Sequence, residues 1–182
     1  MKRIFTLLVI GCFALSLQAQ ERETIWPKGK MPDAQPHQIA AMTDEAGTKG
    51  FKPDKHRTAY IEWFEAPAKE KSNGGCMILI SGGAYESCCD VGLIKRWKEV
   101  FTDLGFQCVN FVYRTPRPEG LAIYQSAWED GQRAVRMVRS EAEKRGFNPE
   151  KIGTISMSAG SHLALLLGTS SLTKAYAPVD KL

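Results

Sequence analysis

The sequence predicts a three-layer α/β fold, in which helices cover both faces of a mostly parallel sheet. Three short runs rich in apolar residues, at 76–80, 106–113 and 151–156, have the composition of strands. Two longer segments, 91–104 and 127–145, place their apolar residues at helical spacing. Strands that alternate with helices in this way build a parallel sheet with a helical layer on each side.

The first expected strand of the sheet spans 58–64, where β-branched and aromatic residues precede Pro67. A polar turn that contains glycine, 69–75, connects it to the continuous apolar run 76–80. Upstream, residues 21–57 are rich in Pro, Lys, Gly and Asp. We expect this part to be an irregular lead-in with at most one short strand.

The first helix is predicted over 91–104, with Asp90 as its N-cap and Gly105 as its C-cap. The strand 106–113 follows, and the prolines and glycine of 114–121 indicate a loop. A long amphipathic helix comes next: it spans 127–145, buries Ala134, Val135, Val138 and Ala142, and ends at the breaker 146–149.

The N-terminus has the pattern of a secretory signal peptide. A basic start, Met1–Arg3, precedes an apolar stretch, Ile4–Leu17, which is too short to span a bilayer comfortably. We expect residues 1–20 to be removed and the protein to be secreted or periplasmic. The alternative is a lipoprotein with its lipid on Cys12, but the apolar stretch continues past that cysteine.

Charge and cysteines exclude several classes of protein. The net charge is +4, and it falls to +2 when Lys2 and Arg3 leave with the signal peptide. Basic residues are spread along the chain and interleaved with acidic ones, which argues against a nucleic-acid partner. The cysteines show no spacing typical of a metal site, and no cofactor is expected. Buried thiols and one structural disulfide both remain open for the cysteines beyond the signal peptide, Cys76, Cys88, Cys89 and Cys108.

Ser158 is the candidate nucleophile. It stands between an apolar strand and a predicted helix, with small residues at Ser156 and Gly160. Such a strand-turn-helix unit can hold a serine hydroxyl exposed on a strained turn, where close backbone packing requires small neighbours. The plainer alternative is an ordinary strand-to-helix turn without catalysis.

Gly82 and Gly83 are the candidate oxyanion hole. They follow the buried strand 76–80, and glycines there let backbone N–H groups point into a site. The N–H of Ala159, directly after Ser158, is the expected partner donor. Chemistry of this type binds the negative oxygen of a tetrahedral intermediate in acyl transfer.

Other polar and aromatic residues favour structural roles. His162 lies four residues after Ser158 on the same predicted helix, so we expect a packed, hydrogen-bonded structural histidine. Asp130 and Arg133 are expected to form a structural polar network. His37 and His56 are expected at the surface, Trp97 and Trp128 in the core, and Tyr85 along a substrate groove.

Five motifs together resemble the acetyl-esterase/lipase branch of the α/β-hydrolases, above all secreted bacterial esterases that act on acetylated or feruloylated plant polysaccharides. They cover roughly 58–170 and are Gly82–Tyr85, Tyr113–Arg114, Asp130–Arg136, Asn148–Gly153 and Ser158–Ala164. The resemblance implies a three-layer α/β-hydrolase fold, with Ser158 as nucleophile and the N–H groups of Gly82, Gly83 and Ala159 as oxyanion hole. The sequence departs from the usual pattern at Ser81, Ala84, Ser156 and Ser161.

In the resembled family, Tyr176–Val179 would begin a sixth strand, and the catalytic acid and histidine would follow well beyond it. We therefore expect a C-terminally truncated member, with 58–182 forming the N-terminal part of the hydrolase domain. Asp180 is too close after the turn to be the triad acid. Without a base, this chain is expected to be nearly inactive.

Three functions are compatible with these residues. The first is a secreted serine carboxylic-ester hydrolase that forms an acyl-enzyme on acetylated or feruloylated polysaccharides or sugars. The second is a serine peptidase of the prolyl-oligopeptidase type, and the third is a non-catalytic, hydrolase-like carbohydrate-binding protein. The expected partner is a small-molecule or polysaccharide ester, with no nucleic acid and no membrane span, and the oligomeric state stays open.

Overall fold

The computed structural model describes residues 21–35, 58–88 and 91–182. Its elements are β1 (Glu21–Thr24), β2 (Tyr60–Trp63), the 3-10 helix η1 (Lys69–Lys71), β3 (Cys76–Ile80), α2 (Val91–Asp103), β4 (Gln107–Val112), α3 (Gln125–Ser140), α4 (Ala142–Arg145), β5 (Ile152–Ser156) and α5 (Ala159–Thr169). The expectations for the signal peptide, Cys12, His37, His56, Cys89 and Asp90 lie outside the described residues.

The five strands form one sheet in the order β1-β2-β4-β3-β5. β3 pairs in parallel with both β4 and β5, whereas β2 pairs antiparallel with β1 and β4. The sheet is therefore mixed: it is parallel in its C-terminal half, as predicted, and antiparallel in its N-terminal half. Parallel neighbours need a crossover connection, which α2 supplies after β3, and α3 and α4 supply after β4.

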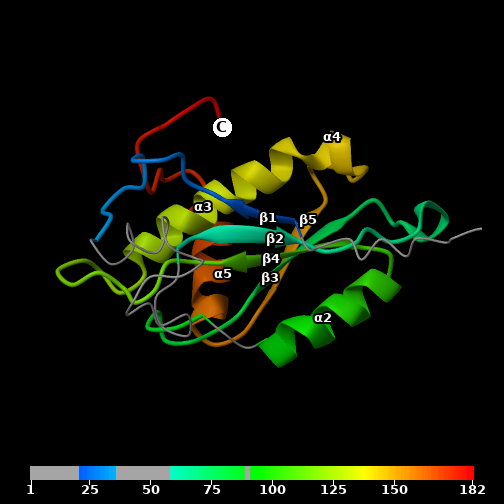
Figure 1. The fold of residues 1–182 in the computed structure, drawn as a ribbon, viewed down its shortest axis with the longest axis horizontal. Coiled ribbons are helices and arrows are strands. Elements are labelled where there is room, and N and C mark those ends of the chain that lie inside the picture. The colour runs from blue at the N-terminus through cyan, green and yellow to red at the C-terminus, as the bar shows by residue number, and fades with distance from the viewer. Residues whose placement is uncertain (1–20, 36–57, 89–90) are drawn as a thin grey trace, which may run out of the picture.

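Helices cover both faces of this sheet, which makes three layers (Figure 1). Ile78 and Ile80 of β3 belong to the core cluster that also holds Ala134 of α3 and Leu163 of α5. Leu79, between them in the strand, packs in a second cluster with side chains of α2. Successive side chains of a strand point to opposite faces, so this alternation places α2 on one face and α3 and α5 on the other.

The long predicted helix is two helices. α3 ends at Ser140, and α4 resumes at Ala142 and ends where Gly146 adopts a left-handed conformation with φ 74°. Ala134, Val138 and Ala142 are buried as predicted, while Val135 is half-buried. Within the described residues, no helix is long and apolar enough to cross a membrane.

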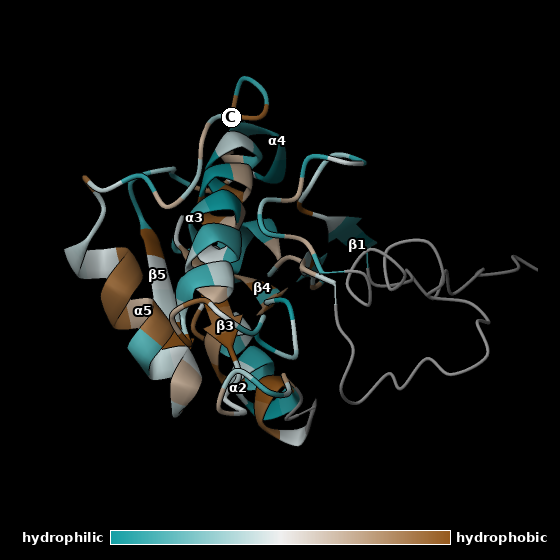
Figure 2. Cartoon of the chain, turned by 90° about the vertical axis from the view of Figure 1, so that its left-hand side faces the viewer, coloured by the Kyte–Doolittle hydropathy of each residue, from teal (hydrophilic) through white to brown (hydrophobic). Residues whose placement is uncertain are grey.

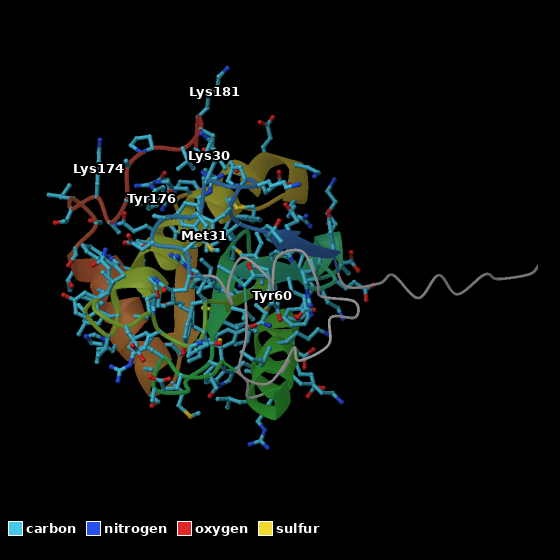
Figure 3. The ribbon with its side chains drawn as sticks, turned by 60° about the vertical axis from the view of Figure 1, so that its left-hand side comes forward. Lys30, Met31, Tyr60, Lys174, Tyr176 and Lys181 are labelled. Carbon is cyan, nitrogen blue, oxygen red and sulfur yellow. The ribbon has the colours of Figure 1, made fainter. Side chains whose placement is uncertain are left out.

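The C-terminal segment 173–182 lies along α3 without forming a strand, so the prediction of a strand at Tyr176–Val179 is wrong. Gln132 of α3 bonds the backbone of this segment twice, donating to Thr173 O and accepting from Ala175 N. The ring of Tyr176 packs edge-on against Trp26. Figure 3 shows Tyr176 near Met31, while Lys174 and Lys181 point outward. Side-chain contacts with α3 and Trp26 thus hold the segment in place of the backbone hydrogen bonds that a strand would make.

Candidate active site

Ser158 occupies a strained turn between β5 and α5. Its backbone has φ 53° and ψ −124°, a conformation that residues with a side chain rarely adopt. α5 begins at the next residue, Ala159. The serine therefore stands outside both regular elements, at the carboxyl end of a parallel strand.

Close packing between this turn and β3 explains the small residue at position 160. A Cβ on Gly160 would lie 2.5 Å from Ser81 O and 2.6 Å from Ile80 O, closer than real contacts of this kind. Met157 N also donates to Ile80 O, at 3.3 Å. α5 thus starts directly against the end of β3, which leaves no room for a side chain at position 160.

Gly82 lies beside the Ser158 hydroxyl. A Cβ built on Gly82 would stand 3.5 Å from Ser158 Oγ and 2.9 Å from Met157 O. Since a Cα–Cβ bond spans about 1.5 Å, the Oγ lies within about 5 Å of the Gly82 Cα. Ala159 is the first residue of α5, and the N–H of a first helical residue has no acceptor inside its helix. The structure therefore brings Ser158, Gly82 and Ala159 together.

Gly83 has a different environment from Gly82. It has φ 134°, and a Cβ there would lie 2.1 Å from Ser87 O. The chain folds back at this point, because Gly83 O accepts hydrogen bonds from the N–H groups of Glu86 and Ser87. Gly83 thus allows the tight loop, whereas Gly82 is the glycine in contact with Ser158.

Tyr85 is buried rather than lining a groove, which corrects the expectation for this residue: its exposed fraction is 2%. Its hydroxyl shares a hydrogen bond of 2.9 Å with Nδ1 of His162. Burial raises the pKa of the Tyr85 phenol to about 12. It is Tyr113, not Tyr85, that bonds Ser81: the Tyr113 hydroxyl donates to Ser81 O at 3.3 Å.

His162 is hydrogen-bonded, as predicted, but it is exposed rather than packed in the core. The ring of Tyr124 meets its imidazole edge-on, with the centroids 5.6 Å apart. Ser156 and Ser161, which stand where the resembled family has glycines, bond each other: Ser156 Oγ donates to Ser161 Oγ at 3.4 Å.

Asp130 and Arg133 both make structural polar contacts, as predicted, but sequence reasoning missed their partners. Asp130 is fully buried and accepts from Arg114 Nε at 2.8 Å and from Trp26 Nε1 at 2.7 Å. Arg114 also pairs with buried Glu129. Burial acts to lower the pKa of the Arg114 guanidinium, but the charges and hydrogen bonds of Asp130 and Glu129 outweigh it and raise the pKa.

Asp180 is engaged away from Ser158. Its two carboxylate oxygens accept hydrogen bonds from both terminal nitrogens of Arg133. These bonds hold the pKa of the Asp180 carboxyl below its usual value. Arg133 also donates to Ile25 O at 2.8 Å. Through Arg133, α3 thus binds segments from both ends of the described chain.

The remaining candidates are structural in this fold. Trp97 and Trp128 are half-buried and pack against the two core clusters. Cys76, Cys88 and Cys108 are buried, and no disulfide joins any two of them. Burial raises the pKa of the Cys76 thiol to about 12. No group of three or more metal-ligating side chains occurs in the described part of the chain.

Two solved structures share this architecture. The acetyl ester-xyloside bifunctional hydrolase of Caldicellulosiruptor lactoaceticus has a TM-score of 0.59 at 20% identity, over 83% of this chain and 47% of that one. The propionate-bound esterase Est2 of Thermogutta terrifontis has a TM-score of 0.56 at 22% identity, over 69% of this chain and 45% of that one. At such identities the likeness shows the fold, which is that of the α/β-hydrolases.

Sequence comparison identifies the family. The endo-1,4-beta-xylanase B of Butyrivibrio fibrisolvens is 32% identical over 89 residues, which make up 48% of this chain and 14% of that protein. The chain therefore spans a small part of this curated relative and less than half of the two solved structures. The sequence profile of the BD-FAE family matches residues 64–179, which include the Gly82 loop and the Ser158 turn. The chain belongs to the BD-FAE family.

Proposed function

We propose that this chain carries the nucleophile and oxyanion hole of a secreted carboxylic-ester hydrolase. The observation that supports this most directly is the strained backbone of Ser158, which presents Oγ beside Gly82. Backbone strain on a residue that is not glycine is typical of functional turns. A serine at such a turn, next to backbone N–H donors, is suited to acyl transfer.

In the proposed reaction, Ser158 Oγ attacks the ester carbonyl carbon and loses its proton to a base. The carbonyl oxygen becomes negative and accepts hydrogen bonds from the N–H groups of Gly82, Gly83 and Ala159. The C–O bond to the alcohol then breaks, and the alcohol leaves with a proton. Water attacks the resulting acyl-serine in the same way, which releases the acid and restores the hydroxyl.

Acetylated or feruloylated sugars and plant polysaccharides are the proposed substrates. Two relatives support this class by their names, one an acetyl ester-xyloside hydrolase and the other a xylanase. Esters of such sugars are neutral, so a cationic site is not required. This fits the mixture of acidic and basic residues along the chain.

None of the described residues can be assigned as the base. Nδ1 of His162 bonds Tyr85, and Asp180 bonds Arg133. The hydroxyl of a serine without a base is a weak nucleophile at neutral pH. We therefore expect the 182-residue chain to release p-nitrophenol from p-nitrophenyl acetate only slowly, at most about 10²- to 10³-fold above water, from its oxyanion hole alone.

A measurement of this slow release, with mass spectrometry of the acetylated chain, tests the proposal. Ser158→Ala should abolish both the excess rate and the acetyl group, whereas Ser161→Ala, on the helix that follows Ser158, should change neither. Gly82→Ala should also lower the rate, because its Cβ would press on the Ser158 turn. An acetyl group that persists in Ser158→Ala would contradict the assigned nucleophile. If the unsubstituted chain instead hydrolysed the ester at ordinary enzyme rates, the base would have to lie within its 182 residues.

Export is part of the same proposal. Among the described residues, Glu21 already pairs with Trp63 in the sheet, so cleavage before Glu21 would keep this pairing. N-terminal sequencing of exported protein should find a start near Gln20 or Glu21, and an intact Met1 or a lipid on Cys12 would contradict it.

A further inference from the structure

Tyr85 connects the two halves of the candidate site. It follows the loop of Gly82 and Gly83, and its hydroxyl bonds His162 Nδ1 at 2.9 Å. His162 belongs to α5, one turn after its first residue, Ala159. The bond therefore joins the segment that holds Gly82 to the helix that begins beside Ser158.

The segment that Tyr85 anchors is strained. Ala84 and Tyr85 have φ 53° and 63°, in the left-handed region that disfavours residues with a side chain. Such conformations persist only where surrounding contacts hold them. Within the loop, Gly83 O accepts from Ser87 N at 3.0 Å, and Tyr85 O accepts from Arg117 N at 2.8 Å. The Tyr85 side chain adds the contact that reaches α5.

The partner imidazole is itself held in place. Its ring meets Tyr85 at 75° and Tyr124 at 72°, both edge-on. Because burial raises the pKa of the Tyr85 phenol to about 12, that hydroxyl keeps its proton at neutral pH. It can therefore donate to Nδ1 of a neutral imidazole that carries its own hydrogen on Nε2. A buried hydroxyl without an acceptor would be costly, so the bond favours the folded loop.

We propose that Tyr85 and His162 form a clasp that positions the Gly82 loop against the start of α5. They are positioning residues: the clasp holds the N–H groups of Gly82 and Ala159 toward one point, where an oxyanion would form. The catalytic consequence rests on the function proposed above, whereas the clasp itself is a property of the fold.

Amide hydrogen exchange of the 182-residue chain tests the clasp directly. The N–H groups of Ser87 and Arg117 are bonded to the strained loop and report its opening. Tyr85→Phe removes only the hydroxyl, and it should speed exchange at both amides by about two- to tenfold. Amides of the β3–β4 ladder should keep their parent rates, because a general loss of stability would speed them as well.

Two further substitutions make the test specific. His162→Leu should reproduce the effect of Tyr85→Phe, whereas His162→Asn keeps an acceptor in the place of Nδ1 and should restore parent exchange. Tyr124→Phe is the matched control, since Tyr124 contacts the same imidazole through its ring. Unchanged exchange in Tyr85→Phe, or equal acceleration throughout the sheet, would overturn the clasp.

Acetylation of Ser158 by p-nitrophenyl acetate tests the catalytic consequence. Tyr85→Phe and His162→Leu should slow it by about two- to tenfold, and His162→Asn should recover the parent rate. If the loop opens but acetylation keeps its rate, the clasp does not position the donors, and that role is refuted. If the parent is never acetylated, the proposed function fails, and amide exchange alone still decides whether the clasp exists.

Discussion

At the level of single residues, the buried Arg114–Asp130 pair shows how charge is accommodated in this core. Both side chains have no exposed surface. Asp130 accepts from the side chain and the backbone N–H of Arg114 and from Trp26. Buried charges are tolerated only when they are paired and hydrogen-bonded in this way.

Asp130→Ala should therefore destabilise the fold by about 3–5 kcal/mol, because it leaves buried Arg114 with one carboxylate partner, Glu129, in place of two and leaves Trp26 Nε1 without its acceptor. Urea unfolding would measure this. Glu86→Ala is the matched control: Glu86 pairs with Arg117 at 2.6 Å, but both side chains are about half exposed. Its loss should cost less than about 1 kcal/mol. Equal costs for the two variants would contradict a decisive role of burial.

At the level of elements, α5 contains two glycines in opposite situations. Gly160 touches the backbone at the end of β3, whereas a Cβ on Gly168 would meet nothing within 4 Å. Alanine favours a helix over glycine where it fits, and overpacking costs stability where it does not. The same substitution therefore has opposite expected effects within one helix.

Gly160→Ala should destabilise the fold by about 2–3 kcal/mol, and Gly168→Ala should stabilise it by up to about 1 kcal/mol. Thermal and urea unfolding of the two variants beside the parent would show the difference in sign. A Gly160→Ala variant as stable as the parent would mean that α5 does not pack on β3 as closely as described.

The C-terminal segment provides a pH-dependent contact with α3. Its Asp180 carboxyl has a lowered pKa because Arg133 donates hydrogen bonds to it. A carboxyl with a lowered pKa stabilises the fold above its usual value of 3.8, and this stabilisation is lost as the pH falls through the lowered pKa.

Asp180→Asn should lower stability by about 1 kcal/mol or less at pH 7, since the pair is partly exposed. The difference from the parent should shrink as the pH falls below 3.8. Unfolding by urea at a series of pH values would follow it. A difference that stays constant down to pH 2 would contradict the ion pair.

At the scale of the whole molecule, large apolar side chains are exposed on α5 and just after it. β5 pairs with β3 on one side, and its other side is an edge within the described chain. Leu165 of α5 is 63% exposed and Leu172 is 99% exposed, and Figure 2 shows the hydrophobic colouring of α5. Exposed sheet edges and apolar patches favour association.

We expect the 182-residue chain to self-associate through this surface, and sedimentation velocity would measure it. Leu165→Glu combined with Leu172→Glu should shift the chain toward monomer. Leu104→Glu is the matched control, because Leu104 follows α2 and is 60% exposed. Equal effects of the two variants would show that association depends on general hydrophobicity rather than on the β5 and α5 surface.

The local sequence pattern was sufficient to predict most helices and strands and the turn at Ser158. The strand 76–80 was predicted with its observed bounds, and the helix at 91–104 within one residue, because a continuous apolar run and helical spacing are properties of neighbouring residues. The requirement for a small residue at position 160 was also evident, since a tight strand-to-helix turn demands it wherever it occurs. The roles of Ser158, Gly82, Gly83 and Ala159 stay predictions.

Contacts between distant residues were beyond such reasoning. Trp26 bonds Asp130 across 104 positions, Tyr85 bonds His162 across 77, and Arg133 pairs with Asp180 across 47. The same holds for the place of β3 between β4 and β5 and for the antiparallel half of the sheet. Residue type and spacing specify which segment becomes a strand or a helix. Which partner each segment or polar group finds depends on the packing of the whole chain, because many polar groups could satisfy the same hydrogen bond.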